Sequence, residues 1–466
     1  MPEIFVVYHK NRLGENLKSE YLGPELSGTR RNINLTFMKA EGAKAKERIF
    51  SSYEVFVIAI LAILQFSVIL DFMILSPIGV FVMPELHIDT THFGLVVSVY
   101  AFSAGTSGLL AAGFADKFDR KKLLLFFYVG FIAGTLLCAI ADTYEFLLLA
   151  RIVTGIFGGV VGSVGMAIIT DLFKPEVRGR VMGFTQMAFA ASQILGLPIG
   201  LILANHFGWH SPFWMIVGFS LLVVVVIIIY MKPIVAHLGL KAEHSAFVHL
   251  FNTLKQPHYL RAFLATALLA TGGYMLMPFG SNFSIFNLGL TRDQLPLLYG
   301  ITGVATIASG PLLGKLSDKT GRYILFCIGT VISGIMVAIY TNLGVTPLWI
   351  IILINVILFV GIMSRIISSS ALMTSIPSPK DRGAFMSVNS SVQSYAGAMA
   401  AGFAGYLVVQ TETGKMEHYN RLGFVVIGTM AITVVMMYFL DRYVKREAAK
   451  NAEHKKNQGS GINATA

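Results

Sequence analysis

Three charged residues stand inside long apolar runs of the sequence: Asp71, Arg151 and Arg365. Placing such a charge in hydrocarbon costs ~3 kcal/mol on insertion scales, so each one is a candidate for function. A carboxylate beside a guanidinium can alternate between an ionised, paired state and a protonated, neutral state. Asp71 and Arg151 are therefore the residues that could couple proton movement to a change of conformation.

The sequence leaves open whether Asp71 and Arg151 meet. We count about 1.5 Å per residue from the outer ends of their runs, near Pro84 and Tyr144. Both residues then lie in the outer half of the membrane, at depths that differ by ~10 Å, which helix tilt could absorb. A structural ion pair that moves no transport proton is the alternative interpretation.

The second half of the sequence offers Arg365 no acidic partner within its apolar runs. We expect Arg365 either to line a cavity and meet an anionic or polar substrate, or to bond carbonyls at a helix end. The stretch "TGGYMLMPFGSNF" adds Tyr274, Met275 and Phe279, which could face an adaptable apolar cavity. Packing against neighbouring helices explains these three residues equally well.

The elements that must position these residues are membrane helices. The chain has 466 residues, of which 55% are hydrophobic and 13% charged, and its mean hydropathy of +0.68 excludes a single soluble core. A window of about 19 residues finds apolar segments that must be helical, because lipid offers backbone groups no partner. The segments are 54–82, 92–114, 122–141, 144–170, 180–204, 210–231, 259–284, 295–315, 322–341, 347–375, 383–409 and 421–441. The predicted fold class is an all-α membrane protein with twelve transmembrane helices.

The basic residues predict the orientation of these helices. Nearly all of the 36 Lys and Arg residues fall in the two tails and in the connections after even-numbered spans. The opposite side holds only Arg292, Lys415 and Arg421. Positive charge marks the cytoplasmic side, so we expect a multi-pass protein of the plasma (inner) membrane with both termini in the cytoplasm. The same distribution accounts for the net charge of +11 without nucleic acid as a partner.

Two loop sequences recur at a nearly constant separation along the chain. "TDLFKPEVRGRVMG" from Thr170 returns as "TSIPSPKDRGAFMS" from Thr374, and "FADKFDRKK" from Phe114 returns as "LSDKTGRYI" from Leu316. This repeat predicts two pseudo-symmetric six-helix halves with a binding site between them. The predicted domains are a disordered cytoplasmic tail (1–50), the first half (51–231), a cytoplasmic linker (232–258), the second half (259–441) and a cytoplasmic C-terminal tail (442–466). Within the first tail, Met38 could be the true start, which would leave residues 1–37 outside the native protein.

The loops resemble the motif that follows span 2 in the major facilitator superfamily, Gly-x-Leu-[Ala/Ser]-Asp-[Arg/Lys]-x-Gly-Arg-[Arg/Lys]. The copy "GKLSDKTGR" from Gly314 fits it well, whereas "AGFADKFDRK" departs at Ala112 and Asp119. The resemblance covers all twelve spans and implies a cytoplasmic gate, in which Asp116 pairs with an arginine and lies near the start of span 11. The implied gate residues are Asp116, Arg120, Asp318, Arg322, Arg178 and Arg382. The alternative is that the basic residues of these loops only set the topology.

Further motifs resemble the branch of twelve-helix drug:proton antiporters and arabinose-efflux proteins. Those proteins carry an acid in span 1 and Arg-x-x-x-Gly in span 4, which stands here as Arg151 to Gly155. In span 5, Gly196, Pro198 and Gly200 approximate the helix-bending motif of exporters. The resemblance thus implies that Asp71 and Arg151 couple protons to transport.

These observations predict a secondary active transporter, a proton-coupled exporter of drug- or sugar-like small molecules that works by alternating access. The alternatives are a proton symporter that imports a sugar or another small metabolite, and a membrane receptor without transport. The sequence shows no phosphate-binding loop, metal-ligand cluster or nucleophile motif, so we expect neither an enzyme nor a bound cofactor or metal. The expected partners are a small-molecule substrate, protons and the lipid bilayer, and a monomer is expected to function.

Overall fold

A computed structural model describes residues 50–235, 238, 252–378 and 381–462. By its contacts the chain divides into two units, Met1–Tyr53 and Glu54–Ala466, and nearly all described residues belong to the second. The possible start at Met38 and most of the predicted N-terminal tail and central linker lie outside the described residues.

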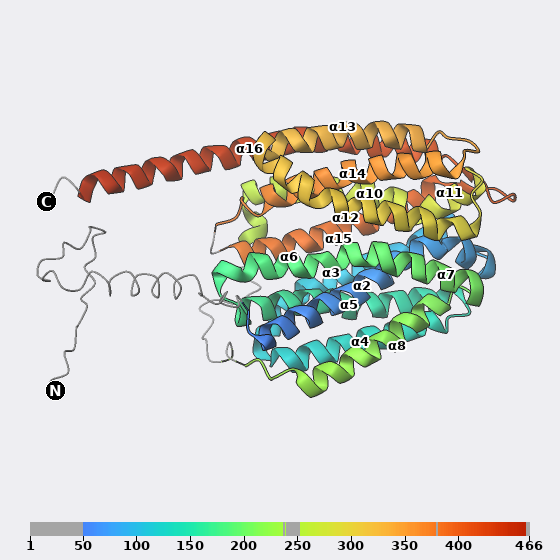
Figure 1. Cartoon of the computed structure of the whole chain (residues 1–466), viewed down its shortest axis with the longest axis horizontal. Coiled ribbons are helices and arrows are strands. Elements are labelled where there is room, and N and C mark those ends of the chain that lie inside the picture. The colour runs from blue at the N-terminus through green and yellow to red at the C-terminus, as the bar shows by residue number, and fades with distance from the viewer. Residues whose placement is uncertain (1–49, 236–237, 239–251, 379–380, 463–466) are drawn as a thin grey trace, which may run out of the picture. The chain divides into compact units, whose positions relative to one another are not determined.

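The first half of the chain forms six membrane crossings, drawn from blue to green in Figure 1. Span 5 consists of two helices joined by a π-helical turn, η3, and a 3₁₀ turn, η2, follows span 2. The elements are α2 (Ser52–Glu85), α3 (Thr90–Phe114), η2 (Ala115–Lys117), α4 (Arg120–Ala139), α5 (Tyr144–Leu172), α6 (Pro175–Ala191), η3 (Ser192–Gly196), α7 (Leu197–Phe207) and α8 (Ser211–Tyr230).

The second half supplies the yellow-to-red helices of Figure 1, and span 7 is interrupted by the 3₁₀ turn η5 at Pro278. Its elements are α10 (Pro257–Leu276), η5 (Met277–Phe279), α11 (Gly280–Phe286), η6 (Arg292–Gln294), α12 (Leu295–Thr320), α13 (Arg322–Tyr340), α14 (Leu348–Met373), α15 (Arg382–Leu407), β1 (Val409–Gln410), β2 (Met416–Glu417) and α16 (Tyr419–Ile462). The short antiparallel ribbon β1–β2 has no counterpart in the predicted spans. It turns at Gly414, whose φ of 84° suits glycine, and the Asn287 side chain bonds both backbone groups of Met416.

The expected all-α membrane fold is confirmed. In the described part of the chain, 11 helices are long and apolar enough to cross a bilayer. The remaining crossing, α15, is long enough but begins with a serine-rich stretch, "MSVNSSVQS", that lowers its hydropathy. Helix α2 continues as a helix through Pro77.

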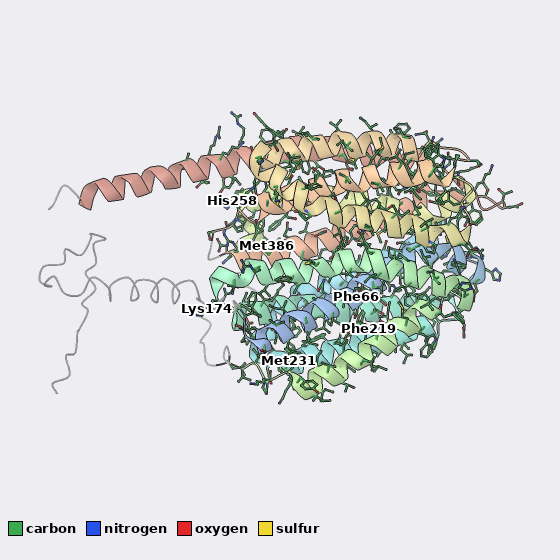
Figure 2. All side chains as sticks on the ribbon, in the orientation of Figure 1. Phe66, Lys174, Phe219, Met231, His258 and Met386 are labelled. Atoms are coloured by element: carbon green, nitrogen blue, oxygen red, sulfur yellow. The ribbon has the colours of Figure 1, made fainter. Side chains whose placement is uncertain are left out.

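The two ends of the helix bundle differ in their connections. One end, which we call the basic end, carries the connections after α3, α5 and α8; Figure 2 labels Lys174, Met231 and His258 there. The other, which we call the far end, carries the connection between α2 and α3 and the ribbon β1–β2.

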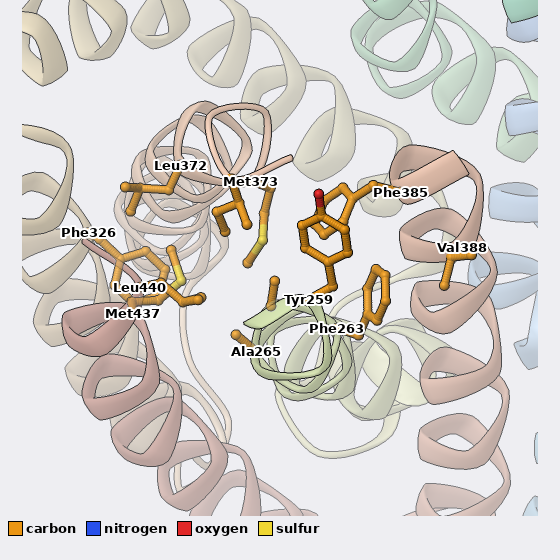
Figure 3. Close-up of a cluster of buried hydrophobic side chains, with 12 residues drawn as sticks. Tyr259, Phe263, Ala265, Phe326, Leu372, Met373, Phe385, Val388, Met437 and Leu440 are labelled. Atoms are coloured by element: carbon orange, nitrogen blue, oxygen red, sulfur yellow. The ribbon is translucent and has the colours of Figure 1, made fainter. Parts of the chain in front are cut away.

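A buried hydrophobic cluster ties the helices of the second half together near the basic end (Figure 3). Tyr259 and Phe263 of α10 pack against Phe385 of α15, with ring centroids 5.0 Å apart in each pair. Phe326 of α13 and Leu372 of α14 belong to the same cluster. The cluster therefore holds α13 and α14 in a fixed relation to α10.

Helices α3 and α15 form the most extensive contact between the halves. Near the far end, a Cβ on Gly94 would lie 2.9 Å from the Cα of Gly405, so only glycines allow the two backbones to come so close. Thr90 Oγ1 donates to the Val408 carbonyl at 2.6 Å, and Ser98 Oγ donates to the Ala398 carbonyl at 2.7 Å. The halves are therefore closely joined at the far end.

Candidate functional site

Asp71 of α2 and Arg151 of α5 form an ion pair. Arg151 Nη1 donates to Asp71 Oδ2 at 2.8 Å and to the Asp71 carbonyl at 3.3 Å. Both side chains are 0% exposed. The depth difference estimated from the sequence thus does not keep the two residues apart.

Two further residues, which the sequence did not single out, complete this site. Thr135 of α4 donates its hydroxyl to Asp71 Oδ1 at 3.1 Å or to the Phe131 carbonyl at 3.0 Å. The Arg151 guanidinium lies over the Tyr100 ring of α3, with Cζ 4.2 Å from the ring centroid. The only sequence signal for either residue was a polar side chain within an apolar span. Four helices of the first half therefore meet at one buried charge pair.

The Arg151 guanidinium is only partly used by this arrangement. Its Nε and Nη2 atoms are buried and have no hydrogen-bond partner among the described residues. A guanidinium has five N–H donors, so a single arm carries the attraction to Asp71. Protonating Asp71 would remove the one charge that compensates Arg151, and an uncompensated buried charge costs several kcal/mol. Protonation of Asp71 can thus greatly lower the stability of this packing of the four helices.

Glycines bring the helices of this site close together. A Cβ on Gly155 would lie 2.5 Å from the Tyr100 carbonyl, and one on Gly134 would lie 2.7 Å from the Cα of Thr154. Real Cβ atoms do not approach backbone so closely, so larger residues would push α3 and α4 away from α5. The glycines therefore set the positions of Tyr100 and Thr135 relative to Arg151.

The predicted bend in span 5 falls where the chain forms the π-helical turn η3. Gly196 ends that turn, and Pro198 lies in the first turn of α7. A Cβ on Gly196 would lie 2.5 Å from Leu70 Cδ1, and one on Gly200 would lie 2.6 Å from Ile74 Cδ1. These glycines let span 5 lie against α2 on either side of Asp71.

At the basic end, the first loop motif is organised around Arg120. Arg120 is 3% exposed; its Nη2 donates to Asp116 at 2.7 Å, its Nε to Asp171 at 2.8 Å, and its Nη1 to the Ala115 carbonyl at 2.7 Å. Asp171 was not among the residues predicted for the gate, although it directly follows Thr170 in the repeated loop. The network joins η2, α4 and the end of α5, all within the first half.

The second copy of the motif makes a similar but uncharged connection. Arg322 Nη1 donates to the Ala371 carbonyl at 2.9 Å and to Ser375 Oγ at 2.8 Å. Ser375 occupies the repeat position that Asp171 holds in the first half. Asp318 is exposed, and no ion pair of Asp318 lies within the described ranges. The repeat therefore preserves the arginine and, in Asp318, the counterpart of Asp116, but it replaces Asp171 with a serine and forms no charged pair among the described residues.

The two remaining gate candidates differ as well. Arg178 caps the end of α5, because its Nε donates to the Phe173 carbonyl at 2.9 Å and its Nη2 to the Thr170 carbonyl at 2.6 Å. Arg382, at the start of α15, is exposed and has no hydrogen bond to another described residue. The implied contact of Asp116 with the start of span 11 is not seen between described residues; Asp116 pairs with Arg120 instead.

Comparison with known proteins decides the family. The sequence matches the family model described as Major Facilitator Superfamily over residues 61–374 and 262–462. The chain belongs to the major facilitator superfamily. It is also 26% identical over 370 residues to an uncharacterised MFS-type transporter, YceJ, of Bacillus subtilis strain 168, and the match covers 78% of this chain and 92% of that protein. The chain is therefore a multi-pass membrane transporter and not an enzyme.

Solved structures of the superfamily share the fold. A bacterial homologue of the human lysosomal transporter Spinster, in an inward-facing and unoccupied conformation, matches with a TM-score of 0.69 and 16% identity over 85% of this chain and 98% of that one. The nucleoside transporter NupG matches with a TM-score of 0.67 and 14% identity, covering 83% of this chain and 99% of that one. At these identities the likeness concerns the fold alone.

Within the superfamily fold, the expected cavity residues take different places. Tyr274 is half-buried between the halves: its ring lies 5.6 Å from Phe72 of α2, and a Cβ on Gly397 of α15 would touch it at 2.5 Å. Met275 is buried, and Phe279 packs against Phe93 at 6.1 Å near the far end. Of these three, Tyr274 alone is part-exposed at the interface of the halves.

Proposed function

We propose that this chain is a proton-coupled exporter of small molecules that works by alternating access, in the branch of drug:proton antiporters and arabinose-efflux proteins. The observation that carries the proposal is the Asp71–Arg151 pair, fully buried within the membrane-spanning helices. Burying a charge pair at such a depth is costly, which favours a functional role for it. Protonation of the carboxylate is sufficient to break the pair.

The hydrogen bonds between the halves support alternating access. Between described residues they lie at the far end and about two thirds of the way along α3 toward the basic end, where Tyr395 donates to Thr106 Oγ1 at 3.0 Å. At the far end, Asn205 Nδ2 also donates to the Arg292 carbonyl and to Asp293 Oδ1, each at 3.2 Å. This state is closed at the far end, with Asp71 paired.

We assign the basic end to the cytoplasm of the inner membrane, because it carries most of the lysines and arginines. The described state is then closed toward the outside and paired at Asp71, as an exporter should be when it awaits cargo from the cytoplasm. Proton uptake from outside would release Arg151 in the opposite state. A differential stabilisation of several kcal/mol is sufficient to shift the population between the two states by a factor of ~10² to 10³.

The loop residues complete the proposed cycle. Arg120 with Asp116 would hold the basic end of the first half as one rigid body, and Arg178 and Arg322 cap helix ends beside it. Asp318 and Arg382 are exposed at the same end, available to contacts in the other state. One chain contains both halves, so we propose that a monomer functions in the bilayer.

The test uses the purified protein in liposomes that contain a trapped pH dye. Compounds from a panel of cationic drugs and neutral sugars are added on one side. An exporter of the proposed kind moves protons against the direction of the compound, whereas a symporter moves both in the same direction. Asp71→Asn should abolish the proton signal, and Asp142→Asn, which changes an exposed acid, should keep it. Unchanged proton flux in Asp71→Asn would overturn the coupling role.

A further inference from the structure

Arg365 of α14 is a buried cation that has no counter-charge among the described residues. Its side chain is 4% exposed, and its Nε has no hydrogen-bond partner among the described residues. Its Cζ lies 5.6 Å from the centroid of the Phe326 ring. A cation–π contact of this kind offsets only part of what it costs to bury an uncompensated charge.

Nearby helices do not supply the missing negative charge in the described residues. The buried acid of α16, Asp441, pairs with Lys445 at 2.7 Å. No Asp or Glu occurs in 257–292, 294–317, 322–376 or 383–411, which are the apolar parts of spans 7 to 11. Arg151 in the first half also has unused N–H groups, but Asp71 neutralises its charge at 2.8 Å. Arg365 therefore differs from Arg151 in needing an anion from outside the chain.

A second donor lies one helical turn away on the same face of α14. Ser368 is 0% exposed, and its Oγ has no partner in the part of the chain that the structure describes. Buried hydroxyls in membrane helices usually bond back to their own helix, as Thr330 does to the Phe326 carbonyl at 2.8 Å and Ser333 to the Gly329 carbonyl at 2.6 Å. Ser368 does not, so its O–H is left free beside the guanidinium.

Close packing fixes these two donors in place. Ser364 Oγ donates to the Leu325 carbonyl of α13 at 2.9 Å, and a Cβ on Gly329 would lie 2.7 Å from the Cβ of Ser364. Helices α13 and α14 are thus held together directly beside Arg365. A preformed pair of donors over an aromatic ring suits an oxyanion attached to an apolar body.

We propose that Arg365 and Ser368 form a binding site for the carboxylate of an organic monoanion, with Phe326 contacting the apolar part of the ligand. The inference rests on the proposed transport function, because it names a chemical class of cargo. It names organic carboxylates as one class of cargo, bound in the second half, while the pair in the first half handles the proton. A free phosphate ion shares the oxyanion chemistry, so the test includes it.

The test is binding to the purified protein in detergent, which needs no proton gradient. Thermal unfolding is followed with benzoate, acetate, inorganic phosphate and the neutral analogue benzamide at equal ionic strength. Benzoate should raise the melting temperature further as its concentration increases, acetate should raise it less, and benzamide not at all. A larger effect of phosphate than of benzoate would overturn the organic monoanion, as would no effect of any anion.

Variants locate the effect within the protein. Arg365→Gln should abolish the benzoate response, Arg365→Lys should retain part of it, and Ser368→Ala should weaken the apparent affinity about tenfold, the worth of one charged hydrogen bond. Arg292→Gln is the matched control, because Arg292 also lies over a phenyl ring, that of Phe81 at 4.7 Å, but is exposed at the far end. An unchanged response in both Ser368→Ala and Arg365→Lys would overturn the site, even if Arg365→Gln failed to fold. The result of the liposome assay is independent of this binding test, because neutral and cationic compounds can drive proton movement there. Failure of the anion site and failure of the transport function can therefore be distinguished.

Discussion

The carboxylate of Asp71 is held on both of its oxygens by different helices. Arg151 of α5 bonds Oδ2, and Thr135 of α4 bonds Oδ1. The arginine supplies the charge, whereas the threonine supplies a hydrogen bond that can switch to the Phe131 carbonyl. The two partners should therefore respond differently to substitution.

Thr135→Val should leave the charge pair intact but remove one partner of a buried carboxylate oxygen. We expect a loss of ~1 to 3 kcal/mol of stability, the usual cost of an unsatisfied buried group. Thr135→Ser should restore most of it, because it keeps the hydroxyl. Thermal unfolding of the three proteins in detergent provides the measurement, and equal stability of valine and threonine would show that the hydroxyl bonds Phe131 only.

Arg120 and Arg322 occupy matching positions of the repeat and offer an internal comparison. Arg120→Ala leaves Asp116 and Asp171 without their shared cation, whereas Arg322→Ala removes bonds to neutral acceptors. We expect Arg120→Ala to cost ~2 kcal/mol and Arg322→Ala ~1 kcal/mol, since bonds between charged groups are the stronger ones. Unfolding should be measured at low and high salt, and only the Arg120 variant should lose part of its effect in salt.

In transport, Arg120→Ala should slow the interconversion of states more than it weakens substrate binding. The reason is that Arg120 joins helix ends of the first half and touches no part of the Asp71 site. Turnover and half-saturation are read from the same liposome assay. Normal turnover combined with weaker binding would contradict a role at the gate.

At the scale of the elements, span 5 controls the environment of Asp71 through two glycines. Gly196→Ala would push a methyl group into Leu70, the residue before Asp71. We expect a loss of ~1 to 3 kcal/mol from overpacking and reduced proton coupling, because α2 must shift. Gly183→Ala on α6 is the control: its Cβ meets nothing within 4 Å, so the variant should gain ~0.5 to 1 kcal/mol from helix propensity. Equal stability of the two variants would contradict the close packing.

The sequence predicted the membrane helices because apolar length and the demand for internal hydrogen bonds leave a chain little choice in lipid. It could not predict how the helices pair across the halves. The Gly94–Gly405 contact depends on two glycines that look like ordinary small residues in their own spans. Likewise, the sequence identified Asp71 and Arg151 as charges within the membrane. It could not predict that they form an ion pair, because helix tilt is set by tertiary packing. The role of Asp171 was not predicted, because the second copy of the repeat has Ser375 at this position.

At the scale of the whole unit, closure of the far end should be separable from the chemistry at Asp71. Asn205→Cys and Asp293→Cys, in a background with Cys138→Ala and Cys327→Ala, place thiols on both sides of the contact between α7 and η6. A bifunctional thiol reagent should join them and stop transport, and reduction of a cleavable reagent should restore it. A pair within α16, at Lys450 and Glu447, should be joined without loss of transport. Full transport by the α7–η6 cross-linked protein would contradict alternating access at this end.

The close approach of Gly94 to Gly405 has a mechanical consequence. The contact lies near one end of α3, and the helix continues from Gly94 to Phe114, a length of ~30 Å. If the two backbones stay in touch there, the contact acts as a fulcrum and α3 as a lever. A roll of ~10° about that point would carry the other end of the helix by ~5 Å, about the rise of one helical turn. A rotation small enough to preserve the glycine contact would thus displace the Asp116–Arg120 loop by more than the width of a water molecule.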